Sequence, residues 1–138
     1  MDSVRIKGEW FFEYGDGRVA GPLENFMTSA GLATVAQWLE EASGAYLAVG
    51  DDTAPGETIT EVFRKAVSAV TRNASLVRFR TQLLAGECNG DHKKACIYLG
   101  GSATPGTGTM LNLLAQPWSK TANNALTVEC RITVAGVA

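Results

Sequence analysis

The sequence predicts a mainly β protein: an antiparallel β-sandwich or partly closed barrel with one short α-helix near residues 29–42. Apolar and polar residues alternate at period two near both ends of the chain. Only one segment repeats apolar residues at helical spacing. Elsewhere strand-like segments follow one another without intervening helices, which favours antiparallel pairing. With 138 residues, no linker and no internal repeat, residues 1–138 are expected to form a single β-rich domain.

The first strand is expected over residues 4–14, followed by a turn and a second strand in which Pro22 marks an edge. Phe11 lies on the charged face of this first strand. A strand of this length exceeds the usual ~5–6 residues, and a long open edge promotes aggregation unless something covers it. Unless the strand is paired on both sides within its own chain, we expect residues 4–14 to lie at a subunit interface. Its apolar face would carry Val4, Ile6, Gly8, Trp10, Phe12 and Tyr14.

The helix is expected to begin after Thr28, a good N-cap residue, and to end at Ser43-Gly44. A short amphipathic helix is not stable alone, so it should pack on a sheet. Its apolar stripe consists of Leu32, Val35, Ala36 and Leu39.

The remaining segments predict short strands. Residues 62–70 and 76–84 form a hairpin around residues 71–74, and the last strand alternates cleanly from Leu126 to Val134. Buried or short strands are expected at residues 45–50, 95–99 and 110–115. The residues expected to be nearly buried are Trp10, Leu39, Val49, Phe79, Val128 and Ile132.

Composition excludes several classes of function. The net charge of −2 and the absence of a basic patch argue against nucleic-acid binding. No run approaches the ~18 apolar residues that would cross a bilayer, so no membrane partner is expected. The N-terminal residues alternate charged with apolar side chains, unlike a signal peptide, which favours a reducing cytosol as the place of synthesis.

Three cysteines and a single histidine carry the few reactive groups. Cys88 and Cys96 either pair across a loop or remain thiols. His92 lies between them, but the Cys-x3-His-x3-Cys spacing is not a zinc pattern. We therefore expect His92 to occupy the tip of a polar loop, with neither a metal site nor a catalytic cysteine. Cys130 is expected at an inward position of the last strand.

Two loops resemble ligand sites only superficially. Residues 100–109 are rich in Gly, Ser and Thr, but no Gly-Lys-Ser/Thr opens a helix as in a phosphate-binding loop. Residues 51–61 are acidic but lack the ligand spacing of a calcium loop. We expect a mobile or interface-ordered loop and a solvated acidic loop, respectively. No cofactor and no enzymatic activity are therefore predicted, and the candidate assembly residues are the aromatics Phe11 and Trp118.

Six short motifs occur in a fixed order along nearly the whole chain. They are N-x-x-T-x-x-G-L at residues 25–32, Y-L-A-V-G at 46–50, E-V-F-R-K at 61–65, E-C-N-G at 87–90, G-T-M-L at 108–111 and L-T-V-E-C-R-I-T at 126–133. Their order resembles that of a family of small bacteriophage virion proteins, of the tail fibre, minor tail or head-associated type. The chain departs from the family's pattern over residues 93–98.

The resemblance implies a structural accessory protein of the tail, baseplate, fibre or neck. It would assemble symmetrically with copies of itself and with other virion proteins, and would reside in the virion after assembly in the host bacterial cytoplasm. A capsid decoration protein is the alternative within the same class. From another class, a module that binds a host-surface carbohydrate is the second alternative, by analogy with other sandwich folds.

Overall fold

The computed structural model describes residues 2–137, which form twelve strands and one helix. Half of the residues are in strands and 9% are helical, and no sheet closes into a barrel, so the predicted mainly β fold with one short helix is confirmed. No helix within residues 2–137 has the length and apolar character to span a bilayer. The elements are β1 (Asp2–Ile6), β2 (Glu9–Glu13), β3 (Val19–Glu24), α1 (Ser29–Glu40), β4 (Tyr46–Gly50), β5 (Glu61–Ala66), β6 (Ala69–Asn73), β7 (Leu76–Leu83), β8 (Gly90–His92), β9 (Lys94–Leu99), β10 (Thr109–Leu114), β11 (Trp118–Lys120) and β12 (Leu126–Gly136).

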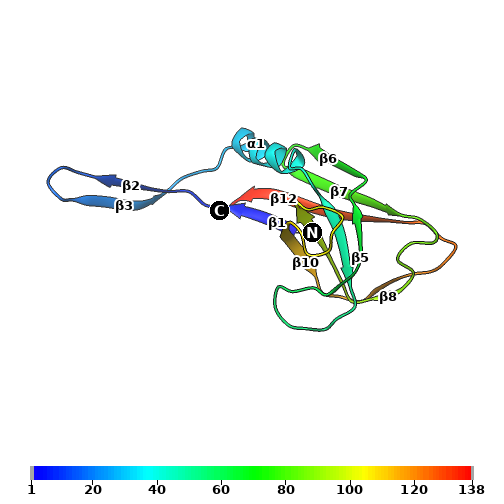
Figure 1. Cartoon of the computed structure of the whole chain (residues 1–138). Helices are drawn as coiled ribbons and strands as arrows, with labels where there is room; N and C mark the ends of the chain where they lie inside the picture. Colours follow the sequence, from blue (N-terminus) through cyan, green and yellow to red (C-terminus); the bar gives the residue numbers. More distant parts are fainter. Residues whose placement is uncertain (1, 138) are drawn as a thin grey trace. The chain divides into compact units, whose positions relative to one another are not determined.

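The chain forms two compact units (Figure 1). The first comprises residues 2–40, Arg72–Val77 and residues 131–137, and the second comprises Glu41–Thr71 and Arg78–Cys130. Strands β6, β7 and β12 each run from one unit into the other. The expectation of a single domain stays a prediction.

Four sheets are present among the described residues. Their strand orders are β1-β12-β7-β6, β10-β9-β4-β5, β11-β8 and β2-β3. Pairing is mainly antiparallel, as predicted, but β1 runs parallel to β12, with Asp2 opposite Ile132 and Ile6 opposite Gly136.

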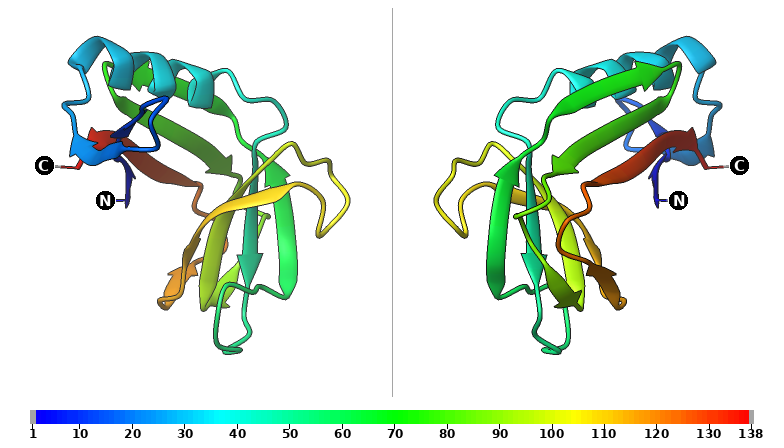
Figure 2. Two further views of the ribbon diagram at one scale, coloured as in Figure 1. Left: turned by 90° about the vertical axis from the view of Figure 1, so that its left-hand side faces the viewer. Right: turned by 90° about the vertical axis from the view of Figure 1, so that its right-hand side faces the viewer.

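The β10-β9-β4-β5 sheet forms the core of the second unit (Figure 2). Strand β4 is buried on both faces from Leu47 to Gly50, and β9 is buried from Lys94 to Tyr98. One face of this sheet packs Ala48, Cys96 and Tyr98 against Met110 and Leu113. The predicted buried strand at residues 45–50 is therefore confirmed, and its continuous apolar run reflects burial on two faces.

Strand β7 confirms the predicted alternation. Val77, Phe79, Thr81 and Leu83 are all buried, while Arg80 and Gln82 between them are exposed. Strand β12 follows the same period: Ile132 and Val134 are buried, and its earlier inward residues, including Cys130, are half-buried.

The expected single strand over residues 4–14 is wrong. The chain breaks at Lys7-Gly8 into β1 and β2, which belong to different sheets. Strand β2 pairs only with β3, and Trp10 is 58% exposed instead of buried. Period-two alternation identified extended backbone correctly, but it does not reveal whether another layer covers the apolar face.

A β-bulge shapes the β2–β3 hairpin. The register shifts between Trp10 and Phe12: the single residue Phe11 on β2 lies opposite two residues of β3, Gly21 and Pro22, so the extra residue is on β3. Within this bulge, Gly21 has a φ of +123°, and a Cβ there would lie 2.5 Å from the Trp10 carbonyl oxygen. Only glycine fits that position, because it tolerates both the backbone conformation and the close approach.

The expected hairpin over residues 62–84 is also corrected. Residues 62–70 do not form one strand: β5 pairs with β4, whereas β6 belongs to the sheet of β7. The chain changes sheets at Val67-Ser68, where the Val67 amide donates to the Ala45 carbonyl and the Ser68 amide donates to the Arg80 carbonyl.

The helix begins as predicted. The Thr28 hydroxyl accepts a hydrogen bond from the Gly31 amide at 3.0 Å, which is the N-cap interaction. The helix ends at Glu40, two residues short of the expected boundary, and Glu40 forms an ion pair with Arg72. Of the expected core, Val49, Phe79 and Ile132 are buried, Leu39 and Val128 are half-buried, and Trp10 is exposed.

Thr81 generates a prediction about stability. Its side chain is 1% exposed, and its hydroxyl has no hydrogen-bond partner among the described residues. Thr81→Val replaces that hydroxyl with a methyl group of similar size, so it should raise the free energy of unfolding by about 1 kcal/mol. Urea denaturation measures the change, and Thr127→Val at an exposed position of β12 is the control. A destabilised Thr81→Val variant would show that the hydroxyl has a partner.

Candidate functional site

The two predicted assembly residues lie in different units. Phe11 lies on β2 of the first unit, opposite the β3 bulge, and is 56% exposed. Trp118 begins β11 in the second unit and is half-buried. Each is described below with its own surroundings.

The hairpin that carries Phe11 exposes apolar side chains on both of its strands. Every residue of β2 is exposed, and so are most residues of β3. The rings of Trp10 and Phe12 stack with centroids 6.4 Å apart, and the Arg18 guanidinium lies 4.7 Å from the Tyr14 ring centroid. The exposed large apolar residues of this segment are Trp10, Phe11, Phe12, Tyr14, Val19 and Leu23.

Trp118 packs against a histidine that the sequence analysis misplaced. His92 is not a loop tip: it ends strand β8, is 6% exposed, and pairs with Trp118 across the β8–β11 ladder. The two rings have centroids 4.8 Å apart. In this segment the side chains of His92 and Lys94 are buried, whereas Asn89, Asp91 and Lys93 are exposed.

The imidazole of His92 lies between a carboxylate and a cysteine. Its Nδ1 is 2.8 Å from Asp51 Oδ1, and its Nε2 is 2.9 Å from the Cys88 carbonyl oxygen and 3.4 Å from the Cys88 Sγ. By distance alone this resembles the Cys–His–carboxylate arrangement of a nucleophilic enzyme. Two observations describe the state of the thiol and of the imidazole.

First, burial raises the pKa of the Cys88 thiol to about 11, and the charge of Asp51 adds to the effect. The thiol is therefore not the reactive thiolate form near neutral pH. Second, His92 Nε2 is closer to the Cys88 carbonyl than to its sulfur. The arrangement joins the start of the loop after β4 to the turn before β8. Cys88 and Cys96 are both thiols, which answers the open question of their pairing in this structure.

Lys94, two residues after His92, is buried with its charge neutralised. The side chain is 3% exposed, and its Nζ donates to Asp52 Oδ2 at 2.8 Å, to the Ala54 carbonyl at 2.8 Å and to the Thr58 carbonyl at 2.7 Å. Asp52 in turn accepts hydrogen bonds from the amides of Thr60 and Ala54. The acidic loop expected to be solvated is therefore tied to a buried ammonium.

These contacts set the ionisation of Asp52. The hydrogen bond from Lys94, followed by that from the Thr60 amide, lowers the pKa of the Asp52 carboxyl to about 2. The carboxylate is therefore charged throughout the ordinary pH range and satisfies one of the three ammonium protons of Lys94.

Arg64 performs the corresponding role for the Gly-rich loop. Its guanidinium makes two hydrogen bonds to Glu61, at 2.7 and 2.9 Å, and its Nη1 donates to the carbonyls of Ser102 and Thr107. Glu61 also accepts from the Gly106 amide at 2.6 Å. Both side chains of the ion pair are almost fully buried.

Two tyrosine rings lie beside the Arg64–Glu61 ion pair, and the ion pair affects the pKa of Glu61. The Arg64 guanidinium lies 4.5 Å from the Tyr98 ring centroid and 5.6 Å from that of Tyr46. Burial acts to raise the pKa of Glu61, but the hydrogen bonds from Arg64 and Gly106 outweigh it and the net shift is downward. Loop 100–108 is thus ordered by its own chain, contrary to the expectation of a mobile or interface-ordered loop.

A third buried cation holds the loop after β7. Lys120 is 4% exposed, and its Nζ donates to Asn89 Oδ1 at 2.7 Å and to the Ala85 carbonyl at 3.2 Å. In the same loop, Glu87 pairs with Lys65 at 2.6 Å. No group of three His, Cys, Asp or Glu within residues 2–137 is arranged to hold a metal ion.

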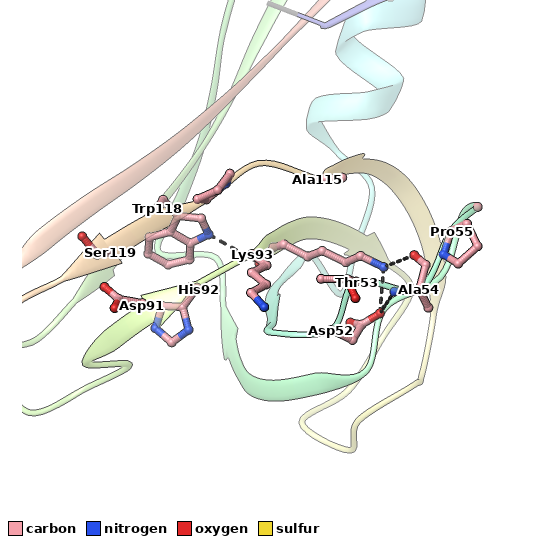
Figure 3. Close-up of a pocket in the computed structure, with 13 residues that line it drawn as sticks. Asp52, Thr53, Ala54, Pro55, Asp91, His92, Lys93, Ala115, Trp118 and Ser119 are labelled. Atoms are coloured by element: carbon pink, nitrogen blue, oxygen red, sulfur yellow. Dashed lines mark hydrogen bonds and ion pairs between the residues drawn. The ribbon is translucent and has the colours of Figure 1, made fainter.

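A pocket of about 860 Å³ lies beside the Lys94–Asp52 ion pair in the second unit (Figure 3). Loop 52–56 forms one wall, residues 91–94 form the floor, and residues 115–119 form the other wall. The indole Nε1 of Trp118 donates to the Lys94 carbonyl at 3.4 Å, which fixes the ring in this wall. Lys94 itself is satisfied by the loop, whereas the neighbouring Lys93 is exposed.

Sequence reasoning missed Arg64, Lys94 and Lys120. The available indication was position: Lys94 directly precedes the apolar run Ala95–Leu99, and Arg64 lies in a strand beside Val62 and Phe63. A basic residue embedded in a strand of the core implies a buried partner, since an unpaired buried charge is too costly.

Comparison of the chain with protein-family models, with curated proteins and with solved structures found no match.

The pKa of Asp52 provides a test of the Lys94–Asp52 ion pair. A pKa lowered from 3.8 to about 2 contributes stability that is present above pH 3.8 and is lost as the pH falls toward 2. Lys94→Met removes the largest cause of the shift, so the Asp52 pKa should rise toward 3.8. Carboxyl NMR titration measures it, with Lys93→Met as the matched control. An Asp52 pKa unchanged by Lys94→Met would contradict the Lys94–Asp52 ion pair.

The raised pKa of the Cys88 thiol leads to a second prediction. With its pKa raised from 9.0 to about 11, the thiolate fraction at pH 7.5 should be about a hundredfold below that of an unperturbed thiol. Iodoacetamide should therefore modify Cys88 correspondingly slowly, as followed by peptide mass spectrometry. Modification as fast as that of a free cysteine would instead support a nucleophile activated by His92.

Proposed function

We propose that this chain is a bacteriophage virion structural protein, of the tail, baseplate, fibre or neck, that assembles symmetrically with copies of itself. The observation that carries the proposal is the β2–β3 hairpin, which exposes six large apolar side chains and has no third strand beside it within residues 2–137. The order of sequence motifs supports the virion class, because it resembles that of small phage structural proteins.

An isolated β-hairpin is stabilised when another surface covers it. A two-stranded sheet is marginally stable in water, and both of its edges keep unpaired N–H and C=O groups. Each aromatic side chain left in water also forgoes roughly 25 cal/mol per Å² of burial. Covering Trp10, Phe11 and Phe12 would therefore lower the free energy of the system. This is expected if the hairpin, residues 7–24, is an arm that docks on a neighbouring molecule.

A second copy of the chain is the occupant that fits best. Residues 7–24 carry two basic and four acidic side chains, so the arm contributes a net charge of −2, which is that of the whole chain. The rest of the chain is balanced, with ten basic and ten acidic residues, and offers a surface that does not repel the arm. Sheet edges β5 and β10 are also open to a copy. Symmetric exchange of arms would cover every hairpin with one kind of contact.

The place on the particle follows from copy number. A capsid decoration protein would approach the abundance of the major capsid protein, whereas a tail or neck component would be far scarcer. Densitometry of purified virions separates these two forms of the proposal.

Phe11→Ser tests the arm. Phe11 is exposed and lies opposite the bulge, so the variant should fold normally but lose self-association and incorporation into particles. Sedimentation velocity should show oligomers that shift toward monomer by at least tenfold in dissociation constant, about 1.4 kcal/mol.

Leu84→Ser is the control for this test, because Leu84 is a similarly exposed apolar residue of the second unit and lies outside the sheet edges β5 and β10. It should leave both assembly and incorporation unchanged. If Phe11→Ser folds and still assembles and incorporates at the wild-type level, the hairpin is not the assembly contact.

A further inference from the structure

The pocket beside Trp118 contains two charged side chains that the fold does not use. Lys93 and Asp91 are both exposed, and neither side chain makes a hydrogen bond or ion pair with any other residue in the range 2–137. In Figure 3 they flank His92 along the pocket floor. Every other cation in this lining is already satisfied, since Lys94 donates to three oxygens.

The wall of the pocket is apolar, flat and fixed in place. Trp118 is held by its hydrogen bond to the Lys94 carbonyl and by its contact with His92. Pro117 extends this apolar wall, and Pro55 adds an apolar surface on the facing wall. Loop 52–56, which forms the facing wall, is held by the Lys94–Asp52 ion pair. The site is therefore preorganised before a ligand arrives.

These groups match the chemistry of one ligand class. An indole presents a flat face suited to the C–H side of a pyranose ring, while carboxylate and hydroxyl groups accept hydrogen bonds from sugar hydroxyls. Asp91 and Ser119 of the pocket lining supply those acceptors. Lys93 supplies a single unpaired ammonium, the partner for one carboxylate.

We propose that this pocket binds an acidic saccharide, a pyranose of the uronic acid type, through Trp118, Asp91 and Lys93. A polyphosphate or nucleic acid fits poorly, because Asp91 and Asp52 would oppose a ligand with several negative charges. This binding site is independent of the β2–β3 arm and goes beyond the assembly role. On a virion, it would supply contact with a charged polysaccharide.

The titration uses Trp118 as its own reporter. The chain has three tryptophans, and both Trp10→Phe and Trp38→Phe fall at exposed positions, so the double variant leaves Trp118 as the only indole. Oligosaccharides of galacturonate, glucuronate and mannuronate are titrated separately, with their neutral counterparts alongside. At least one uronate should change the fluorescence saturably and bind about tenfold more tightly than its neutral counterpart.

Matched variants identify the ammonium that reads the carboxylate. Lys93→Ala should weaken uronate binding about tenfold and leave binding of the neutral sugar unchanged. Lys7→Ala, an exposed lysine of the first unit, should change neither. The titration is repeated with Phe11→Ser, so that loss of assembly and loss of sugar binding are scored separately.

Three results would overturn the proposal. The first is the absence of saturable binding by all three uronates. The second is equal binding of acidic and neutral sugars. The third is uronate binding that is insensitive to Lys93→Ala.

Discussion

The second unit depends on the burial of positive charge. Arg64, Lys94 and Lys120 are each enclosed, and each donates hydrogen bonds to oxygen atoms of a loop; Arg64 and Lys94 also pair with a carboxylate. Because an unpaired buried cation costs several kcal/mol, those loops are held wherever the cation needs its acceptors. Lys94 thereby fixes the wall of the Trp118 pocket, and Arg64 fixes the Gly-rich loop. Loops that look disordered by composition become rigid parts of the molecule.

The β2–β3 hairpin of the first unit follows the opposite principle. Its apolar side chains lie in solvent, and no buried charge or third strand holds them. A preorganised pocket and an uncovered aromatic arm are complementary properties for a protein that builds a particle and meets a surface. The proposed assembly role uses the arm, and the proposed saccharide site uses the pocket. Either can fail without the other.

Sequence patterns predicted what depends on neighbours along the chain. The alternation of β7, the buried run of β4 and the Thr28 cap are local features, and all three were found. What depends on distant partners was missed. His92 meets Asp51 and Lys94 meets Asp52 across 41 and 42 residues, so no local pattern marks them as buried. The prediction that Trp10 is buried was wrong for the converse reason. Alternation along a strand does not specify whether another layer covers its apolar face.

Hydrogen exchange of loop 100–108 tests most directly whether buried charge orders the loops. The Ser102 amide donates to Thr107 Oγ1 and the Gly106 amide donates to Glu61 Oε2, and both acceptors are held by Arg64. The account predicts that these two amides are protected in the wild-type chain and lose protection in Arg64→Lys, while β4 amides keep theirs. Unprotected Ser102 and Gly106 amides in the wild-type chain, or protection unchanged by Arg64→Lys, would contradict it.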